Sequence, residues 1–453
     1  MGFADGYLQK SALRKALPSD PPRDAVQLII CLPAYRESGL HRSLDSLFQC
    51  HGQVPAEVLI LINAPESEPS SGKRENEVLA DQARSWIRSH LHPTLNFHLG
   101  IDQGFPDRHA GVGLARKVLM DEALRRFSLL DRPGGILASL DADARVDPNY
   151  LTALVSHFHT PVGPASSATG EGSRPFLPEG ASLYFEHPLS PEEDPGGPAY
   201  PAEVYRAIAL YELHVRTYLW WVRSTGFPHA FHTVGSAFAV RADTYAAEGG
   251  MNRRQGGEDF YFIQKVARRG RFTACTETRV APSPRPVGRV PFGTGPAVSR
   301  ILAQPGNARL DSYHPQPFAH LRDLFAGIGH LRHAPLSSLR PGLHPVLAEF
   351  LRSQDGEAAL EEIRRNSASD EMFRKRFWHW FHMFRVMKYL HFARERGFSD
   401  VPVEESARAC LEEWSGRSTG NLPEDAGELL TEFRRMDRSP IPQSGTRPHP
   451  LFS

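Results

Sequence analysis

The sequence lacks most of the features that would assign a chain to a simple class. Its 453 residues include four cysteines and no C-x-x-C pair, so we expect neither a disulfide scaffold nor a cysteine zinc site. Lysine plus arginine number 52, as do aspartate plus glutamate, and this balance argues against a general nucleic-acid binder. No apolar run approaches the ~20 residues that span a bilayer, and no secretory signal is apparent. We expect a cytoplasmic protein, with a peripheral contact to the inner membrane face left open.

What the sequence does contain is an alternation of strand and helix patterns. Continuous apolar runs at 26–32, 57–63, 95–101 and 134–143 predict buried strands, and helical patterns separate them. Strands that are buried on both faces are typical of a parallel sheet covered by helices. The order therefore predicts an α/β fold with a mostly parallel sheet and helices on both faces.

The strand patterns continue to about residue 282 and then stop. Beyond residue 300 the apolar spacing predicts helices alone. These helices are expected at 344–353, 356–365, 370–396, 403–413 and 423–436. We divide the chain into an N-terminal segment (1–24), an α/β domain (25–300), a helical C-terminal region (301–436) and a disordered tail (437–453).

Ligands of open parallel sheets bind beyond the carboxyl ends of the strands. The first strand is followed by Tyr35, Arg36 and Glu37, and we expect Pro33 to end its hydrogen-bond ladder. Neither G-x-G-x-x-G nor G-x-x-x-x-G-K-[ST] follows any strand, so the dinucleotide fingerprint and the P-loop are both missing. By itself the segment is equally compatible with an ordinary strand-to-helix turn.

The fourth strand ends in two acids, Asp141 and Asp143. Residues i and i+2 of a strand point to the same side, so we expect the two carboxylates to converge. Mg²⁺ and Mn²⁺ prefer such oxygen ligands. A solvated turn is the alternative interpretation.

A third acidic element, Glu258 and Asp259, follows two glycines at a predicted helix start. Carboxylates at this position complement the helix dipole. They are also placed to take a proton from an attacking hydroxyl as a general base. The residues alone favour neither role.

Together these motifs resemble the family 2-like glycosyltransferases of the GT-A fold. The order P-x-Y-x-E, D-x-D and E-D carries the resemblance, which covers roughly residues 25–285. Segments 227–262 and 289–295 are similar to a bacterial subgroup of soluble predicted transferases. The resemblance implies transfer of a sugar from a nucleotide-sugar donor to an acceptor hydroxyl, with Mn²⁺ or Mg²⁺ and with inversion.

The resemblance also implies roles near the nucleotide. Pro33, Ala34, Tyr35 and Glu37 match the motif that lines the base and ribose. Asn63 stands where family members commonly carry an acid that contacts the base, so a preference for uridine is not implied.

The remaining matches concern the metal and the reaction. Asp141 matches the acid that faces ribose or metal, and Asp143 matches the direct metal ligand. Asp259 matches the catalytic base of inverting members, with Glu258 beside it. Arg116 and Lys117 lie in a helix that often contacts the nucleotide.

Some alternatives stay open. A nucleotidyltransferase on a related sheet, or a non-catalytic nucleotide-sugar binding module, is compatible with much of this pattern. His232 is either a third metal ligand or a packed structural histidine. The aromatic segment 372–392 predicts a core-facing stripe, or else a membrane-surface helix that would suit a lipid-linked acceptor.

Overall fold

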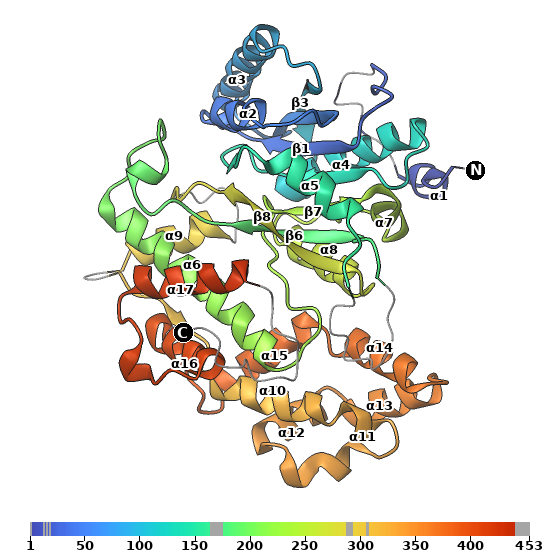
Figure 1. Cartoon of the computed structure of the whole chain (residues 1–453), viewed down its shortest axis with the longest axis vertical. Coiled ribbons are helices and arrows are strands. Elements are labelled where there is room, and N and C mark those ends of the chain that lie inside the picture. Colours follow the sequence, from blue (N-terminus) through green and yellow to red (C-terminus); the bar gives the residue numbers. More distant parts are fainter. Residues whose placement is uncertain are drawn as a thin grey trace. The chain divides into compact units, whose positions relative to one another are not determined.

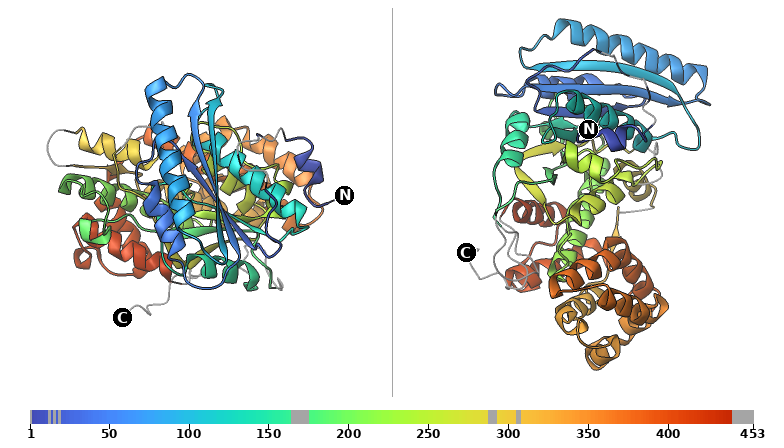
Figure 2. Two further views of the ribbon diagram at one scale, coloured as in Figure 1. Left: turned by 90° about the horizontal axis from the view of Figure 1, so that it is seen from above. Right: turned by 90° about the vertical axis from the view of Figure 1, so that its right-hand side faces the viewer.

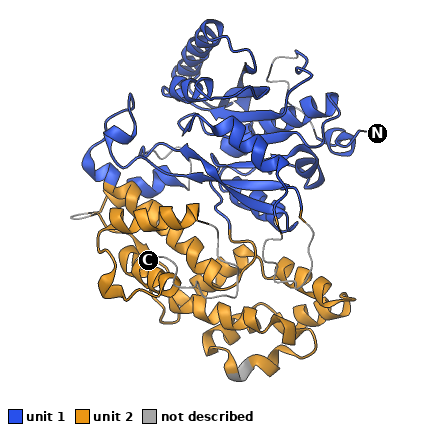
Figure 3. Ribbon diagram, viewed as in Figure 1, with its two compact units in different colours: residues 1–162, 176–205, 231–300 blue, residues 163–175, 206–230, 301–453 orange. Residues whose placement is uncertain are grey.

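The computed structural model describes residues 2–11, 14, 17, 20–163, 175–286, 293–304 and 308–439 (Figure 1). The chain divides into two compact units (Figure 3). Unit 1 comprises 1–162, 176–205 and 231–300, and unit 2 comprises 163–175, 206–230 and 301–453. Among the described residues, no helix is long and apolar enough to cross a membrane. The boundaries proposed from the sequence stay a prediction.

Unit 1 is built on an eight-stranded sheet with the strand order β3-β2-β1-β4-β7-β6-β8-β5. Strands β3, β2, β1 and β4 are parallel to one another. Strand β7 is antiparallel to β4 and β6, β8 is parallel to β6, and β5 is antiparallel to β8. The strands are β1 (Leu28–Ala34), β2 (Ala56–Pro65), β3 (Leu95–Phe105), β4 (Ile136–Ser139), β5 (Arg145–Val146), β6 (Gly180–Phe185), β7 (Phe238–Arg241) and β8 (Phe272–Ala281). The predicted α/β class with a mostly parallel sheet is confirmed.

Helices cover both faces of this sheet. Figure 2 shows α3 and α4 on opposite sides of the N-terminal strands. The helices of unit 1 are α1 (Asp5–Leu8), α2 (Leu40–Phe48), α3 (Ser70–Ser89), α4 (Val112–Leu129), α5 (Tyr150–His159), α7 (Ala242–Ala247), α8 (Glu258–Ala267) and α9 (Thr294–Leu302), with a 3₁₀ turn at Pro191–Glu193.

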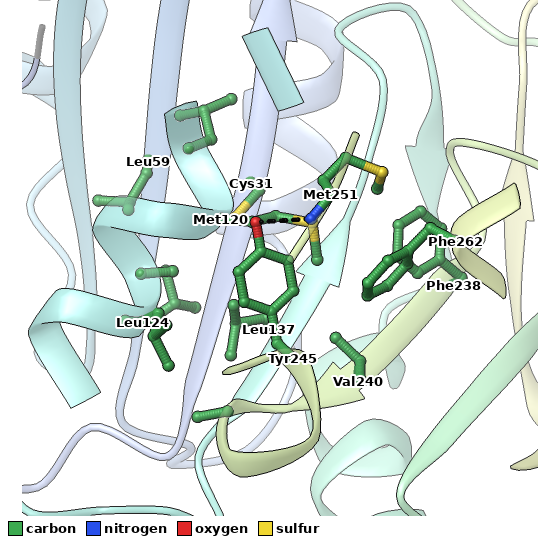
Figure 4. Close-up of a cluster of buried hydrophobic side chains, with 14 of the residues drawn as sticks. Cys31, Leu59, Met120, Leu124, Leu137, Phe238, Val240, Tyr245, Met251 and Phe262 are labelled. Carbon is green, nitrogen blue, oxygen red and sulfur yellow. Dashed lines mark hydrogen bonds between the residues drawn. The ribbon is translucent and has the colours of Figure 1, made fainter. Parts of the chain in front are cut away.

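The main core of unit 1 lies between the sheet and helices α4, α7 and α8 (Figure 4). Alternate residues of β1, Ile29 and Cys31, face this core, as the two-residue period of a strand requires. Tyr245 of α7 is fully buried there, and its hydroxyl accepts a hydrogen bond from the Met251 backbone N–H at 3.1 Å. This packing fixes α4 and α8, the two helices that carry the candidate site.

Pro33 does not end the first strand as predicted. It pairs with Leu61 of β2, and β1 continues to Ala34. The last pair between β1 and β4 is Cys31 with Ser139, and the Cys31 carbonyl accepts from Leu140 N–H at 3.1 Å. Pro33 lies two residues after Cys31, so its backbone nitrogen also faces the β4 side, but β4 has already ended there. The missing N–H of proline therefore removes no hydrogen bond from the sheet.

Unit 2 is helical, which confirms the predicted C-terminal extension. It contains most of α6 (Ala202–Ser224), then α10 (Gln316–Ala326), α11 (Ile328–Leu331), α12 (Pro345–Ser353), α13 (Gly356–Arg365), α14 (Asp370–Trp380), α15 (Met383–Arg394), α16 (Val403–Ser415) and α17 (Ala426–Arg438), with 3₁₀ turns at Leu336–Gly342 and Thr419–Asn421. Two short strands, β9 (Asp311–Ser312) and β10 (Val401–Pro402), pair antiparallel. Arg216 of α6 is fully buried and ion-paired with Asp437 of α17. Residues 440–453 lie outside the described residues.

The single helix expected over 370–396 is two helices. It breaks at Phe381–His382, between α14 and α15. Phe373, Phe377 and Phe381 are fully buried, as the predicted core stripe requires, whereas Phe384 beyond the break is 37% exposed. The break therefore divides the aromatic segment into a buried part and a partly exposed part.

Candidate active site

The loop after β1 is tied to the end of β2 by one buried side chain, Asn76 of α3. Its Oδ1 accepts from Arg36 N–H at 3.0 Å, and its Nδ2 donates to the Asn63 carbonyl at 3.2 Å. Arg36 has φ of 49°, in the left-handed region that non-glycine residues rarely adopt. The Tyr35 hydroxyl donates to Glu68 at 2.7 Å. The two strand ends that the sequence assigns to the nucleotide are thus fixed together.

The two acids of the D-x-D motif do not lie on a strand. Strand β4 ends at Ser139, and Asp141 and Asp143 lie in the turn that follows. The expectation that they share one side of a strand is therefore wrong, because the two-residue period holds only within extended backbone. Both side chains are partly exposed, at 36% for Asp141 and 32% for Asp143. Their carboxylates have different partners.

Asp143 is linked to the first-strand motif through Arg285. The Arg285 guanidinium donates to Asp143 at 3.2 Å and to Glu37 at 3.0 Å. Glu37 is 4% exposed, so its charge is compensated at a nearly dry position. One arginine therefore connects the predicted nucleotide motif with the predicted metal ligand.

Asp141 is linked to the start of α8 through Arg116 of α4. Arg116 is 2% exposed, donates to Asp141 at 2.7 Å and forms an ion pair with Glu258. Glu258 is itself 1% exposed. Acids that are far apart in the sequence thus converge on one buried guanidinium, which is the close arrangement that the three motifs predict.

Asp259 lies beside the same guanidinium, where Gly235 makes room for both. A Cβ atom at Gly235 would lie 2.9 Å from Arg116 Nη2 and 3.0 Å from Asp259 Oδ2. The Asp259 carboxylate also accepts from the Phe260 backbone N–H at 2.7 Å, in the first turn of α8. Any side chain at position 235 would push the arginine and the aspartate apart.

Burial raises the pKa of Asp259 above its ordinary value. The negative charge of Asp141 raises this pKa further, while the positive charge of Arg116 opposes the rise. A carboxylate whose pKa is raised holds a proton more strongly, and so is a better base than an ordinary aspartate. The structure therefore gives Glu258 and Asp259 different environments. Glu258 is ion-paired with Arg116, whereas the raised pKa makes Asp259 the stronger base.

Lys117 and His232 lie in other surroundings. The Lys117 ammonium donates to Asp121 at 2.9 Å and to the Tyr7 hydroxyl at 2.5 Å, and it is only 9% exposed. The His232 ring is also 9% exposed and packs edge-on to Phe185, with centroids 5.1 Å apart. The role of Lys117 toward a nucleotide and that of His232 toward a metal both stay predictions.

The residues able to hold a cation at this edge are Asp141 and Asp143, which offer carboxylate oxygens only. Hard divalent cations take such ligands, together with water and substrate phosphates. The partly exposed carboxylates after β4 fit Mg²⁺ or Mn²⁺. Of the glycine-bearing segment at 289–295, residues 289–292 lie outside the described residues.

Sequence reasoning missed two residues that hold this site together, Asn76 and Gly235. Asn76 is a polar residue on the otherwise small and apolar buried face of α3, and a polar residue at such a position indicates a structural or functional role. Gly235 gave no comparable signal, because its role depends on side chains that are distant in the sequence.

No family model matches the chain, and no curated protein matches it. Several solved glycosyltransferase structures do. S. aureus TarS 1-349 is 12% identical with a TM-score of 0.33, over 57% of this chain and 60% of that one. A second structure of S. aureus TarS is 11% identical with a TM-score of 0.34, over 86% of this chain and 55% of that one. The chain thus aligns with somewhat more than half of each TarS structure.

A further match is the mannosyltransferase PcManGT from Pyrobaculum calidifontis, solved with GDP-Man and Mn²⁺. It is 15% identical with a TM-score of 0.36, over 87% of this chain and 92% of that one. At these identities and TM-scores the matches carry no argument about the function of this chain. The argument about function therefore depends on the site itself.

Proposed function

We propose that the protein is a metal-dependent glycosyltransferase that moves a sugar from a nucleotide-sugar donor to an acceptor hydroxyl, with inversion. One observation carries the proposal: Asp141, Glu258 and Asp259 converge on the buried Arg116 at the carboxyl edge of the sheet. Ligands of open α/β sheets bind at this edge. The acids supply both of the functions that such a transfer needs, a metal ligand and a base.

Asp143, together with Asp141, would hold the divalent cation. A cation there would neutralise the charge that develops on the leaving diphosphate. Arg285 now donates to Asp143, so this guanidinium has to share the carboxylate with the metal or move toward Glu37. The nucleotide would lie against Pro33, Ala34 and Tyr35.

Asp259 would accept the proton of the acceptor hydroxyl. Its raised pKa favours that transfer, and its position in the first turn of α8 places it near the metal carboxylates. Glu258 is the weaker candidate for the base, because its buried carboxylate is engaged with Arg116. We assign Glu258 and Arg116 as positioning residues that hold Asp141 and Asp259 in place.

The test is a thermal-shift and hydrolysis panel with UDP-, GDP-, ADP- and dTDP-sugars, each with and without Mn²⁺. Ligands that bind only the native state raise its melting temperature by mass action. We expect one donor to give a metal-dependent shift that Asp143→Asn abolishes. The matched control is Asp81→Asn, which alters an exposed acid of α3 and should leave the shift unchanged.

The outcomes separate this proposal from its rivals. A metal-dependent shift that persists in Asp143→Asn would exclude the D-x-D assignment. Donor binding without turnover for any acceptor, unaffected by Asp259→Asn, would favour a non-catalytic binding module. Transfer of a nucleotidyl group instead of a sugar would identify a nucleotidyltransferase.

A further inference from the structure

A second group of potential metal ligands lies in unit 1 and shares no residue with the group assigned above. His157 of α5 and Cys275 and Glu277 of β8 bring an imidazole nitrogen, a thiol sulfur and a carboxylate oxygen within 4.8 Å of one another. The proposed transferase uses none of these three residues. Their chemistry also differs from that of Asp141 and Asp143, because it combines nitrogen, sulfur and oxygen.

An irregularity in β8 brings the glutamate to the cysteine. Cys275 pairs with Leu183 of β6, but the next residue of β6, Tyr184, pairs with Arg279. The residues between them bulge out of the register, and such bulges re-aim side chains. The Glu277 carboxylate turns back, accepting from Thr276 N–H at 3.0 Å and from the Cys275 thiol at 3.4 Å.

The bulge is anchored on its other side as well. Asn149, next to the start of α5, donates its side-chain amide to the Glu277 carbonyl at 2.7 Å. The helix that carries His157 is therefore tied directly to the bulge. This anchoring reduces the rearrangement that a bound ion would require.

The histidine is oriented by a hydrogen-bond chain that leaves one nitrogen free to bind a metal. The Thr273 hydroxyl donates to the Gly180 carbonyl at 3.3 Å, and it lies 2.8 Å from His157 Nε2. A hydroxyl has one hydrogen, so while it donates to the Gly180 carbonyl it accepts from the imidazole, and the proton is then on Nε2. The lone pair is then on Nδ1, which lies 4.0 Å from Glu277. Metal-bound histidines are oriented in this way by a partner on their other nitrogen.

Two of the three distances between ligand atoms are close to those of a small tetrahedral ion, and the third, from sulfur to nitrogen, is within 4.8 Å. Zinc bonds of about 2.0–2.3 Å to nitrogen, oxygen and sulfur place tetrahedral ligands about 3.3–3.7 Å apart. The sulfur-to-carboxylate distance of 3.4 Å already lies in this range. The nitrogen-to-carboxylate distance of 4.0 Å needs a closure of roughly half an ångström. The Glu277 side chain is 65% exposed, so water can supply a fourth ligand.

We propose that His157, Cys275 and Glu277 form a zinc-binding site. A thiolate and a carboxylate balance the charge of Zn²⁺, and the neutral imidazole completes three protein ligands. Binding replaces the S–H bond of Cys275 with a sulfur–zinc bond and releases that proton to solvent. Hard cations such as Mg²⁺ and Ca²⁺ prefer oxygen alone and would not select this set.

Two pKa directions agree with this geometry. Burial lowers the pKa of His157, which keeps its imidazole neutral. Burial raises the pKa of the Cys275 thiol, so the metal-free site holds a thiol that donates to Glu277, as the structure shows.

The test uses the full chain, freed of metal by chelation, and titrates it with Zn²⁺ or Co²⁺ alone while Mg²⁺ is held in excess to occupy oxygen sites. We expect one equivalent of zinc by calorimetry and a thiolate-to-cobalt charge-transfer band in the near ultraviolet. Cys275→Ser should abolish the band. Cys50→Ser is the matched control, since Cys50 is also buried in unit 1 but its thiol faces backbone carbonyls.

Two further variants keep the proposal falsifiable if Cys275→Ser fails to fold. Glu277→Gln changes an exposed side chain, and it should weaken zinc binding at least tenfold with an unchanged circular dichroism spectrum. Thr273→Val removes only the hydroxyl that orients His157, and should weaken binding by about 10–100-fold. Absence of stoichiometric zinc binding in the parent protein, or a cobalt band that survives in Cys275→Ser, would overturn the proposal. Zinc binding that is unchanged in both Glu277→Gln and Thr273→Val would overturn it equally.

Discussion

The sheet of unit 1 carries two groups of potential cation ligands that differ in chemistry. The group after β4 offers the carboxylates of Asp141 and Asp143, each bonded to an arginine. The group on β8 and α5 offers sulfur, nitrogen and oxygen, with no arginine bonded to its side chains among the hydrogen bonds described for these residues. Arginine beside the first group suits phosphate-rich ligands, whereas mixed donors beside the second suit a lone borderline ion. The difference teaches that ligand type and charge environment together decide which kind of cation each group suits.

The largest effect expected is on turnover. Asp259→Asn keeps the shape of the side chain but removes the base, and loss of a general base typically costs 10²–10⁴-fold in rate. We expect that loss in kcat for sugar transfer, with donor affinity and zinc affinity both unchanged. Full activity in this variant would exclude Asp259 as the base, and a parallel loss of zinc binding would show that the two sites are not independent.

The next largest effect is on stability. Arg116→Ala leaves the buried carboxylate of Glu258 without its partner, and breaking a buried pair costs about 3–5 kcal/mol. Urea unfolding should show that loss in the free energy of unfolding. Arg84→Ala is the control, because the exposed Arg84–Asp81 pair should contribute less than about 1 kcal/mol. A similar small loss for both variants would contradict the importance given to Arg116.

A smaller effect distinguishes the two metal sites directly. Asp143→Ala should remove the Mn²⁺-dependent part of donor binding, while leaving zinc affinity as in the parent protein. Glu277→Gln should do the reverse. Calorimetric titration of both variants with Mn²⁺ plus donor and with Zn²⁺ alone checks this. If either variant loses both the Mn²⁺-dependent donor binding and the zinc binding, the two groups of ligands do not act separately.

The smallest effect concerns pH. The pKa of Asp259 is raised on folding, so its protonated form favours the folded state. That contribution is complete below the ordinary aspartate pKa and is lost as pH rises through the raised value. Asp259→Asn should therefore melt at a higher temperature than the parent at pH 7, and the difference should vanish below about pH 4. A constant difference across this pH range would contradict the raised pKa.

Much of the α/β fold could be predicted because its strands are buried on both faces. The centres of strands β1 and β2 are continuous apolar runs, and they are buried throughout. The ends of the strands and helices were less predictable. The sequence does not show that β4 stops at Ser139, or that the helical pattern breaks at Phe381–His382, because tertiary packing decides both.

The candidate site could be predicted only in outline. The convergence of the ends of β1, β2 and β4 follows from their parallel topology. The contact of Arg116 with both Asp141 and Glu258 is made by side chains and does not follow from the strand order. The group of His157, Cys275 and Glu277 could not be found by spacing, since its ligands come from a helix and a bulged strand far apart in the sequence. Spacing rules for zinc apply to ligands supplied by one local motif.

The position of Arg285 between two carboxylates bears on how the metal and the nucleotide bind. One guanidinium bonds both Glu37 of the first-strand motif and Asp143 of the metal motif, so a cation arriving at Asp143 changes the field that Glu37 experiences. If the nucleotide binds beside Glu37, linkage requires that each ligand alter the other's affinity by the same factor. Metal and nucleotide would then bind as a cooperative pair, and Arg285 is the residue through which their binding free energies are coupled.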